Sequence, residues 1–237
     1  MPEAERDLLL VVGHLSNELN IFNKLFYWCS NNFSAKEPAL RKAHSAQALA
    51  LARVLAGKFA ESWVILRKVY FASRLSKEYH SLLTPEALEA LDNLRKYFGK
   101  ANLVHTIRNR FAFHYDLAEI RSGFALPNDL EEWDIYLAES NGNTLYYVAD
   151  LVANYALLNS IVPGDLKAAM ESLIQELIQV GGWFIAFLGG CMIVLGERYL
   201  LDEEGNPVVT EIGLPNTPSL DEIEIPYFVV TPRHDER

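Results

Sequence analysis

The densest group of polar side chains in this sequence lies between residues 105 and 116, in the segment His105-Thr106-Ile107-Arg108-Asn109-Arg110-Phe111-Ala112-Phe113-His114-Tyr115-Asp116. An arginine beside an imidazole suits a phosphate ester, because the guanidinium binds two oxygens in a fork while the imidazole exchanges a proton near neutral pH. The residue types therefore favour proton transfer at a bound phosphate ester, with Arg108 and His114 as the candidates.

On a helix, the spacing of these residues decides which of them share a face. His105 and Asn109 lie one turn apart, as do Arg110 and His114. Arg108 and His114 are six residues apart, about 240° around a straight helix, so they meet one ligand only if the helix bends or their side chains wrap around it. The alternative interpretation is that Arg108 and Arg110 are surface residues and that Asp116 or a backbone group satisfies His114.

The residues around Arg108 and His114 resemble a known family signature. Arg108-Asn109 followed by Phe111-Ala112-Phe113-His114-Tyr115-Asp116 resembles the signature of the HEPN superfamily (higher eukaryote and prokaryote nucleotide-binding domains), in which an Arg, often followed by Asn, precedes a His by four to six positions. The resemblance covers this motif and the all-helical layout of about residues 1–200. It is closest to the toxin-like and abortive-infection branches, which implies a defence or toxin–antitoxin setting.

The resemblance implies a metal-independent endoribonuclease that works as a homodimer, with its two motifs facing across the interface. It implies that Arg108 holds the scissile phosphate and that His114 is the acid or base when the ribose 2′-hydroxyl attacks. It also implies that Asn109 orients the motif or binds the phosphate. No cofactor or metal is expected.

Further polar residues are candidates for binding the RNA or nucleotide. Four of them belong to the same segment: Arg110, His105, Tyr115 and Asp116. Two more, His14 and Glu18, lie one turn apart on the first predicted helix and would form a polar wall opposite the motif. The alternative interpretation of His14 and Glu18 is the solvated face of an amphipathic helix.

The charge of the chain limits how it can bind nucleic acid. The net charge is -10; the stretch 202–237 has nine acids and two bases, a balance of -7, which leaves 22 acids and 19 bases, or -3, in residues 1–201. A long-range basic field is therefore absent, and RNA binding would depend on a small basic pocket. Many members of the superfamily are not catalytic, so the alternative function is a non-catalytic helical module that binds a protein partner through its surface and acidic tail.

Apolar residues recur at three- and four-residue steps over most of the first 200 residues, which predicts helices. Turn signals separate the predicted helices, which cover residues 4–31, 34–79, 84–98, 101–120, 143–160 and 165–200. A capping box at Ser34-Ala35-Lys36-Glu37 and a Thr84-Pro85-Glu86 start mark two of the beginnings. Gly57 is the expected site of any bend. Residues 133–137 and 145–147 are candidates for a short strand pair.

The predicted architecture is an all-α bundle of about five main helices over residues 1–201. It has a small insertion near residues 122–144, and an acidic, proline-containing tail at 202–237 follows. We expect this extended tail to pack on its own body or on a partner.

One apolar segment raises the question of a membrane. Leu177 to Gly196 has twenty residues without a charge, which is long enough for a membrane span. Its five glycines and the lack of a Lys/Arg cluster at either end favour a buried central helix. Cys29 and Cys191 belong to no paired motif, and the charged N-terminus has no signal-peptide pattern, so we expect a reduced, cytoplasmic protein.

Overall fold

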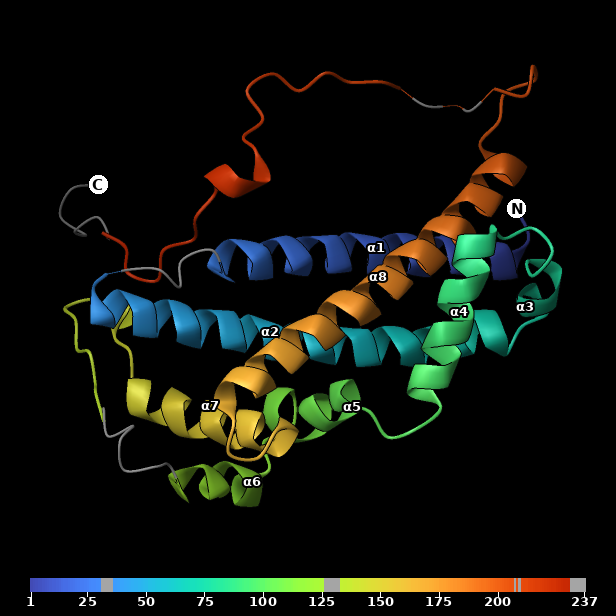
Figure 1. Cartoon of the computed structure of the whole chain (residues 1–237). Helices are drawn as coiled ribbons and strands as arrows, with labels where there is room; N and C mark the ends of the chain where they lie inside the picture. Colours follow the sequence, from blue (N-terminus) through green and yellow to red (C-terminus); the bar gives the residue numbers. More distant parts are fainter. Residues whose placement is uncertain (31–35, 126–132, 207, 209, 231–237) are drawn as a thin grey trace. The chain divides into compact units, whose positions relative to one another are not determined.

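The computed structural model of the chain describes residues 1–30, 36–125, 133–206, 208 and 210–230. All of its regular elements within these residues are helices, which confirms the all-α class. The longer helices are α1 (Glu3–Ser30), α2 (Pro38–Leu66), α4 (Pro85–Phe98), α7 (Tyr147–Ile161) and α8 (Leu166–Tyr199) (Figure 1). The short α-helices are α3 (Leu75–Glu78), α5 (Leu103–Ile107) and α6 (Leu117–Ser122).

The single-turn elements are of other helical types. Two are π turns, η1 (Arg67–Phe71) and η2 (Arg108–Ala112). The 3₁₀ turns among the described residues are η3 (Gly123–Ala125), η5 (Asn141–Asn143) and η6 (Leu220–Glu222).

Several predicted boundaries hold, and others are wrong. The start at Thr84 is confirmed: its side chain accepts a hydrogen bond from Ala87 N at 3.3 Å, and Pro85 is the first helical residue. The prediction of one helix up to Tyr79 is wrong, because α2 ends at Leu66. The helix continues through Gly57, and the π turn η1 follows it, in which Ala72 N–H donates to Arg67 O. The capping hydroxyl predicted at Ser34 lies outside the described residues.

The insertion differs from the predicted strand pair. In place of a strand pair there is a single antiparallel bridge between Tyr136 and Leu145, whose two N–H···O bonds are both 2.8 Å long. The fourth helix begins at Tyr147 rather than at residue 143, because η5 and this bridge take up residues 141–145. Much of the insertion, residues 126–132, lies outside the described part of the chain.

The described chain forms two compact units, each assembled from three stretches. Unit 1 contains residues 1–21, 55–106 and 174–217, and unit 2 contains residues 22–54, 107–173 and 218–237.

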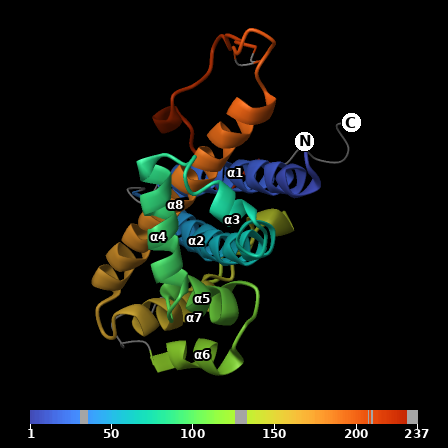
Figure 2. The same cartoon turned by 90° about the vertical axis from the view of Figure 1, so that its right-hand side faces the viewer.

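Aromatic stacking fills the interior of unit 1. Phe59 and Phe184 stack in parallel with ring centroids 5.4 Å apart, and Tyr70 meets Phe187 edge-on at 5.2 Å. These four side chains are fully buried. Helix α4 lies beside α8 (Figure 2), and it approaches closely at Gly190, where an added Cβ would lie 2.4 Å from Ala87 Cβ. Glycine is therefore required by the packing of these two helices.

A buried carboxylate joins three elements of unit 1. Glu5 is 4% exposed and accepts hydrogen bonds from Tyr79 (3.0 Å), Tyr199 and Arg198. Burial opposes the charge on Glu5, but these three donors outweigh it and hold its pKa below the ordinary value of 4.5. The N-terminus of α1 is thereby fixed to α3 and to the end of α8.

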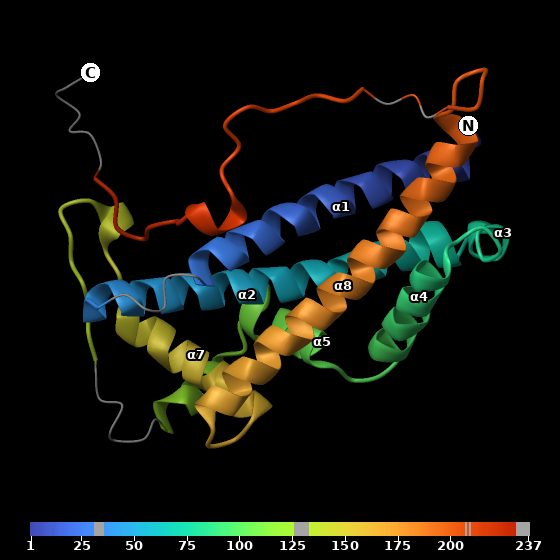
Figure 3. The same ribbon diagram turned by 45° about the horizontal axis from the view of Figure 1, so that its top comes forward.

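The C-terminal segment, defined as residues 218–230, packs within unit 2. Trp28 Nε1 donates to Leu220 O at 3.1 Å, and Tyr27 bonds Asp221, so η6 lies next to the last turns of α1 (Figure 3). Further along, Asn143 makes two hydrogen bonds with the backbone of Val229, at 2.6 and 2.9 Å. This part of the predicted tail is therefore ordered by contacts with its own body.

Helix α8 is long and apolar enough to cross a membrane by length and composition. Its most apolar 18-residue window has a mean hydropathy of 2.0, and half of that window is buried by the protein itself.

The contact at Gly190 makes a stability prediction with an internal control. Gly190→Ala should lower the free energy of unfolding by about 1–3 kcal/mol, because its methyl group has no room against Ala87. Gly189→Ala adds the same methyl group at an exposed helical position with nothing within 4 Å, and it should raise stability by about 0.5–1 kcal/mol. Urea unfolding of both variants measures the difference, and equal effects would contradict the close approach.

The pKa of Glu5 predicts how stability changes with pH. Because its folded pKa lies below the unfolded value, the contribution of Glu5 is complete above pH 4.5 and is lost as the pH falls through the folded pKa. Glu5→Gln should therefore melt at a lower temperature than the wild type at pH 7, and the gap should shrink below pH 4.5. Thermal melts between pH 7 and pH 3 measure this gap, and a constant gap would show that the charge of Glu5 is not involved.

Candidate functional site

The chemistry-bearing segment begins in α5 and leaves the helix at a π turn. Phe113 N–H donates to Arg108 O at 3.3 Å, which is the five-residue bond of a π turn, and the helix ends at Ala112. Ile107 and Phe111 are buried and anchor the turn. The prediction of one helix from 101 to 120 is therefore wrong, and the angle calculated for a straight helix does not apply. Such turns are common at functional sites.

The structure brings Arg108 and Asn109 together and leaves His114 in solvent. Arg108 Nη1 donates to Asn109 Oδ1 at 2.8 Å, so the guanidinium and the amide lie side by side. Their N–H groups suit the oxygens of a phosphate. His114 follows the end of the helix and is exposed. Exposure gives its imidazole access to a substrate proton, as proton transfer requires.

Two neighbouring residues have structural partners. Arg110 forms an ion pair with Glu119 at 2.5 Å, which neutralises its charge. Asp116 caps α6, because its side chain accepts from Ala118 N at 2.9 Å and from Glu119 N at 3.3 Å. This cap explains why a helix begins again at Leu117. It also sets the point at which the non-helical segment that contains His114 ends.

Three further predicted residues, His105, His14 and Glu18, belong to unit 1. His105 is half-buried, with Nδ1 3.2 Å from Asn102 Nδ2 and its ring edge-on to Phe98. The side chain of His14 is 71% exposed and lies 3.7 Å from Glu18, whose carboxylate also binds Lys58 at 2.6 Å. These contacts give Glu18 and His105 a structural role in unit 1. A role in substrate binding stays a prediction.

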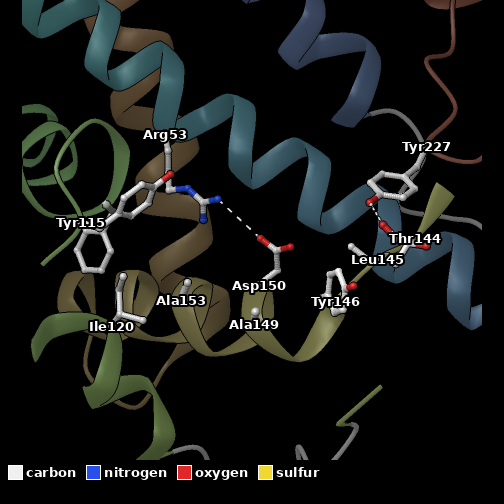
Figure 4. A pocket seen from close by; sticks show the side chains of 11 residues that line it. Arg53, Tyr115, Ile120, Thr144, Leu145, Tyr146, Ala149, Asp150, Ala153 and Tyr227 are labelled. Atoms are coloured by element: carbon white, nitrogen blue, oxygen red, sulfur yellow. Dashed lines mark hydrogen bonds and ion pairs between the residues drawn. The ribbon is translucent and has the colours of Figure 1, made fainter. Parts of the chain in front are cut away.

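A cavity of about 310 Å³ lies beside the segment in unit 2 (Figure 4). Its lining includes two residues of the segment, one of α2, one of α7, one that precedes α7 and one of the C-terminal segment: Phe111, Tyr115, Arg53, Asp150, Tyr146 and Tyr227. The hydroxyl of Tyr227 donates to Thr144 O at 3.1 Å, which holds this wall of the cavity in place. The segment thus supplies part of a concave site, the usual form of a ligand pocket.

A half-buried charge pair lies in the wall of this cavity. Arg53 Nη2 lies 3.8 Å from Asp150 Oδ1, and Arg53 Nη1 donates to Asn154, which is buried. Burial raises the pKa of Asp150, with the charge of Arg53 opposing the rise, and burial lowers the pKa of Arg53. Titratable groups perturbed in a cleft are candidates for a functional site.

A second hollow of about 420 Å³ adjoins the first, since Leu145, Asp150 and Tyr227 line both. It contains Gln47, whose Oε1 atom is buried and has no hydrogen-bond partner among the described residues. A buried unpaired acceptor is costly, so this oxygen suits a ligand that donates.

Unit 1 has a hollow of its own, about 390 Å³ in volume. It presents two exposed arginines, Arg67 and Arg95, over aromatic residues. Arg95 already lies 4.9 Å from the ring centre of Phe71 and pairs with Asp92 at 3.6 Å. This hollow holds no buried polar atom without a partner, and it is therefore a weaker candidate than the cavities of unit 2.

Four residues of the cavity region were not predicted from the sequence: Arg53, Asp150, Asn154 and Tyr227. One signal was present, because Asp150 and Asn154 lie one turn apart in the largely apolar helix α7. Arg53 and Tyr227 gave no signal, because their place in the site depends on contacts across the fold. Within the described ranges, no group of three or more His, Cys, Asp or Glu side chains could hold a metal ion.

Comparison of this chain with protein-family models, with curated proteins and with solved structures finds no match.

The cap at Asp116 predicts how this residue responds to substitution. Asp116→Ala should lower the free energy of unfolding by about 1 kcal/mol, because two N–H groups of α6 lose their acceptor. Asp116→Asn should keep most of that stability, since asparagine also caps helices. Urea unfolding measures both variants. An equal loss in both would show that the charge of Asp116, rather than its cap, is what matters.

Proposed function

We propose that this protein is a metal-independent endoribonuclease whose catalytic residues are Arg108, Asn109 and His114. The observation that carries the proposal is the end of the helix at Ala112. It leaves His114 exposed just beyond the turn that carries the hydrogen-bonded Arg108–Asn109 pair. A phosphate-binding pair beside an accessible imidazole is what cleavage of an RNA phosphodiester requires.

The reaction follows from these groups. His114 accepts the proton of the ribose 2′-hydroxyl, whose oxygen attacks the adjacent phosphorus while Arg108 and Asn109 bind the phosphate oxygens. The bond from phosphorus to the 5′-oxygen breaks, and that oxygen takes up a proton. The products are a 2′,3′-cyclic phosphate and a 5′-hydroxyl. We propose that the active form is a homodimer in which the second motif supplies the protonated imidazole.

The charge of the chain shapes this proposal. With a net charge of -10, the protein gains no long-range attraction for RNA, so binding must come from short-range contacts at the site. We place the activity in a defence or toxin–antitoxin setting on the basis of the motif resemblance, and in the cytoplasm because the two cysteines belong to no paired motif.

The second candidate function is a non-catalytic interaction module. The exposed part of the tail favours it, because Ile212 and Leu214 are more than 70% exposed beside acidic residues. Residues 218–230 already bind their own unit, so this function would use the tail before residue 218. Removing those exposed side chains would then reduce partner binding while Arg108→Ala would not.

The ribonuclease function predicts cleavage that depends on His114. Wild-type protein should cleave end-labelled RNA in excess EDTA and leave 2′,3′-cyclic phosphate ends. His114→Ala should lower the rate about 10²–10⁴-fold, because general acid–base catalysis contributes that much. Arg108→Ala should lower it as well, through the loss of phosphate binding. Gel analysis of the ends and rates measures each effect.

The matched control is His80→Ala. It removes an exposed histidine that lies in unit 1, away from the motif in the sequence, and it should leave the cleavage rate unchanged. Light scattering on the same preparation checks the dimer. Equal rates for wild type and His114→Ala would remove the catalytic role. Lack of cleavage by the wild type would favour the interaction module.

A further inference from the structure

The two adjoining hollows of unit 2 contain hydrogen-bond acceptors that the described protein does not saturate. The ion-pair partner of Asp150 among the described residues is Arg53, at 3.8 Å, which is beyond hydrogen-bonding distance. Gln47 Oε1 is buried and has no partner there. Figure 4 shows the Asp150 carboxylate pointing from α7 toward Arg53. A ligand that brings hydrogen-bond donors would therefore find acceptors in both hollows.

The charges around these hollows favour a neutral ligand. Arg53 and Asp150 are the charged residues that line them. A cationic ligand would be repelled by the guanidinium and an anionic one by the carboxylate. A ligand that offers donors to Asp150 and acceptors to Arg53 satisfies both charges at once.

Aromatic side chains define the shape of the ligand. Tyr115 and Tyr146 are 74% and 60% exposed, so their rings are accessible, and Phe111 and Tyr227 complete the lining. Aromatic walls bind flat rings, as in the stacking of unpaired bases of RNA. The volumes, about 310 and 420 Å³, lie at the lower end of the range for small-ligand pockets. They suit a single base or nucleoside.

We propose that this cavity binds a guanine base, with Asp150 and Arg53 as its specificity-determining residues. Guanine has two adjacent donors, N1–H and N2–H, which match the two oxygens of one carboxylate. Its O6 and N7 are acceptors of the kind that arginine binds in pairs. The second N2–H is left for Gln47 Oε1. Adenine, cytosine and uracil each place an acceptor beside the donor on that edge, so they repel a carboxylate.

This inference rests on the proposed function only in assigning the base to an RNA substrate. Phe111 and Tyr115 belong both to the cavity wall and to the segment between Arg108 and Asp116. A base held there belongs to a nucleotide near the phosphate at the cleavage site. The enzyme would therefore cleave RNA next to guanine.

The experiment measures nucleoside binding by isothermal titration calorimetry with the full chain. Nucleosides carry no phosphate, so they report on the base cavity and not on Arg108. Guanosine should bind, inosine should bind about ten-fold more weakly because it lacks the N2 amino group, and 1-methylguanosine and adenosine should bind least. Equal binding of guanosine and inosine, or no binding of guanosine, overturns the proposal. This comparison needs no variant that could misfold.

Two variants separate recognition from stability and from cleavage. Asp150→Asn should weaken guanosine binding about ten-fold or more, because a charged acceptor is lost. Asp165→Asn, the matched control, makes the same change at an exposed cap of α8 in the same unit, and it should leave binding unchanged. Equal affinity in Asp150→Asn and Asp165→Asn overturns the role of Asp150.

His114→Ala should bind guanosine as well as the wild type does. If the wild type binds guanosine but does not cleave RNA, the ribonuclease proposal is refuted and the guanine cavity is supported. If it cleaves RNA but does not bind guanosine, the guanine cavity is refuted and the ribonuclease proposal is supported.

Discussion

Burial of Phe111 is the constraint on which the candidate site depends. Its side chain is 2% exposed and belongs to the π turn, so the backbone around it has little freedom. One turn before it, the buried Ile107 fixes the other side of the same turn. Because both anchors are buried, Asn109 is left exposed beside the half-buried Arg108, and His114 lies beyond the helix end. The same phenyl ring also lines the cavity, which joins the proposed chemistry to the proposed base recognition.

The charge pair of Arg53 and Asp150, beside the ring of Phe111, costs free energy. Binding of a ligand would explain why the protein keeps this pair. Arg53 and Asp150 lose hydration inside unit 2, and a separation of 3.8 Å recovers only part of it. Apolar residues at these two positions would avoid that cost. A base that pairs with both side chains would restore their hydrogen bonds, as the proposed guanine site requires. The buried oxygen of Gln47 fits the same interpretation.

Unit 1 and the C-terminal segment are each ordered by contacts between residues far apart in the chain. In unit 1, stacked aromatic rings and the buried Glu5 cluster join residues far apart in the chain. In unit 2, the C-terminal segment supplies Tyr227 to the cavity and is held by paired hydrogen bonds at Asn143. The tail is acidic, yet its last described residues are part of the folded body.

The sequence by itself determined the helical class and most helix ends, because apolar periodicity and caps such as Thr84 are local properties. It could not determine the π turn at Arg108, since a five-residue hydrogen bond depends on how Ile107 and Phe111 are buried by the fold. The single Tyr136–Leu145 bridge, predicted as a strand pair, shows the same limit. The cavity was decided only by tertiary structure: Arg53 and Asp150 are far apart in the chain, and only helix packing brings them to 3.8 Å.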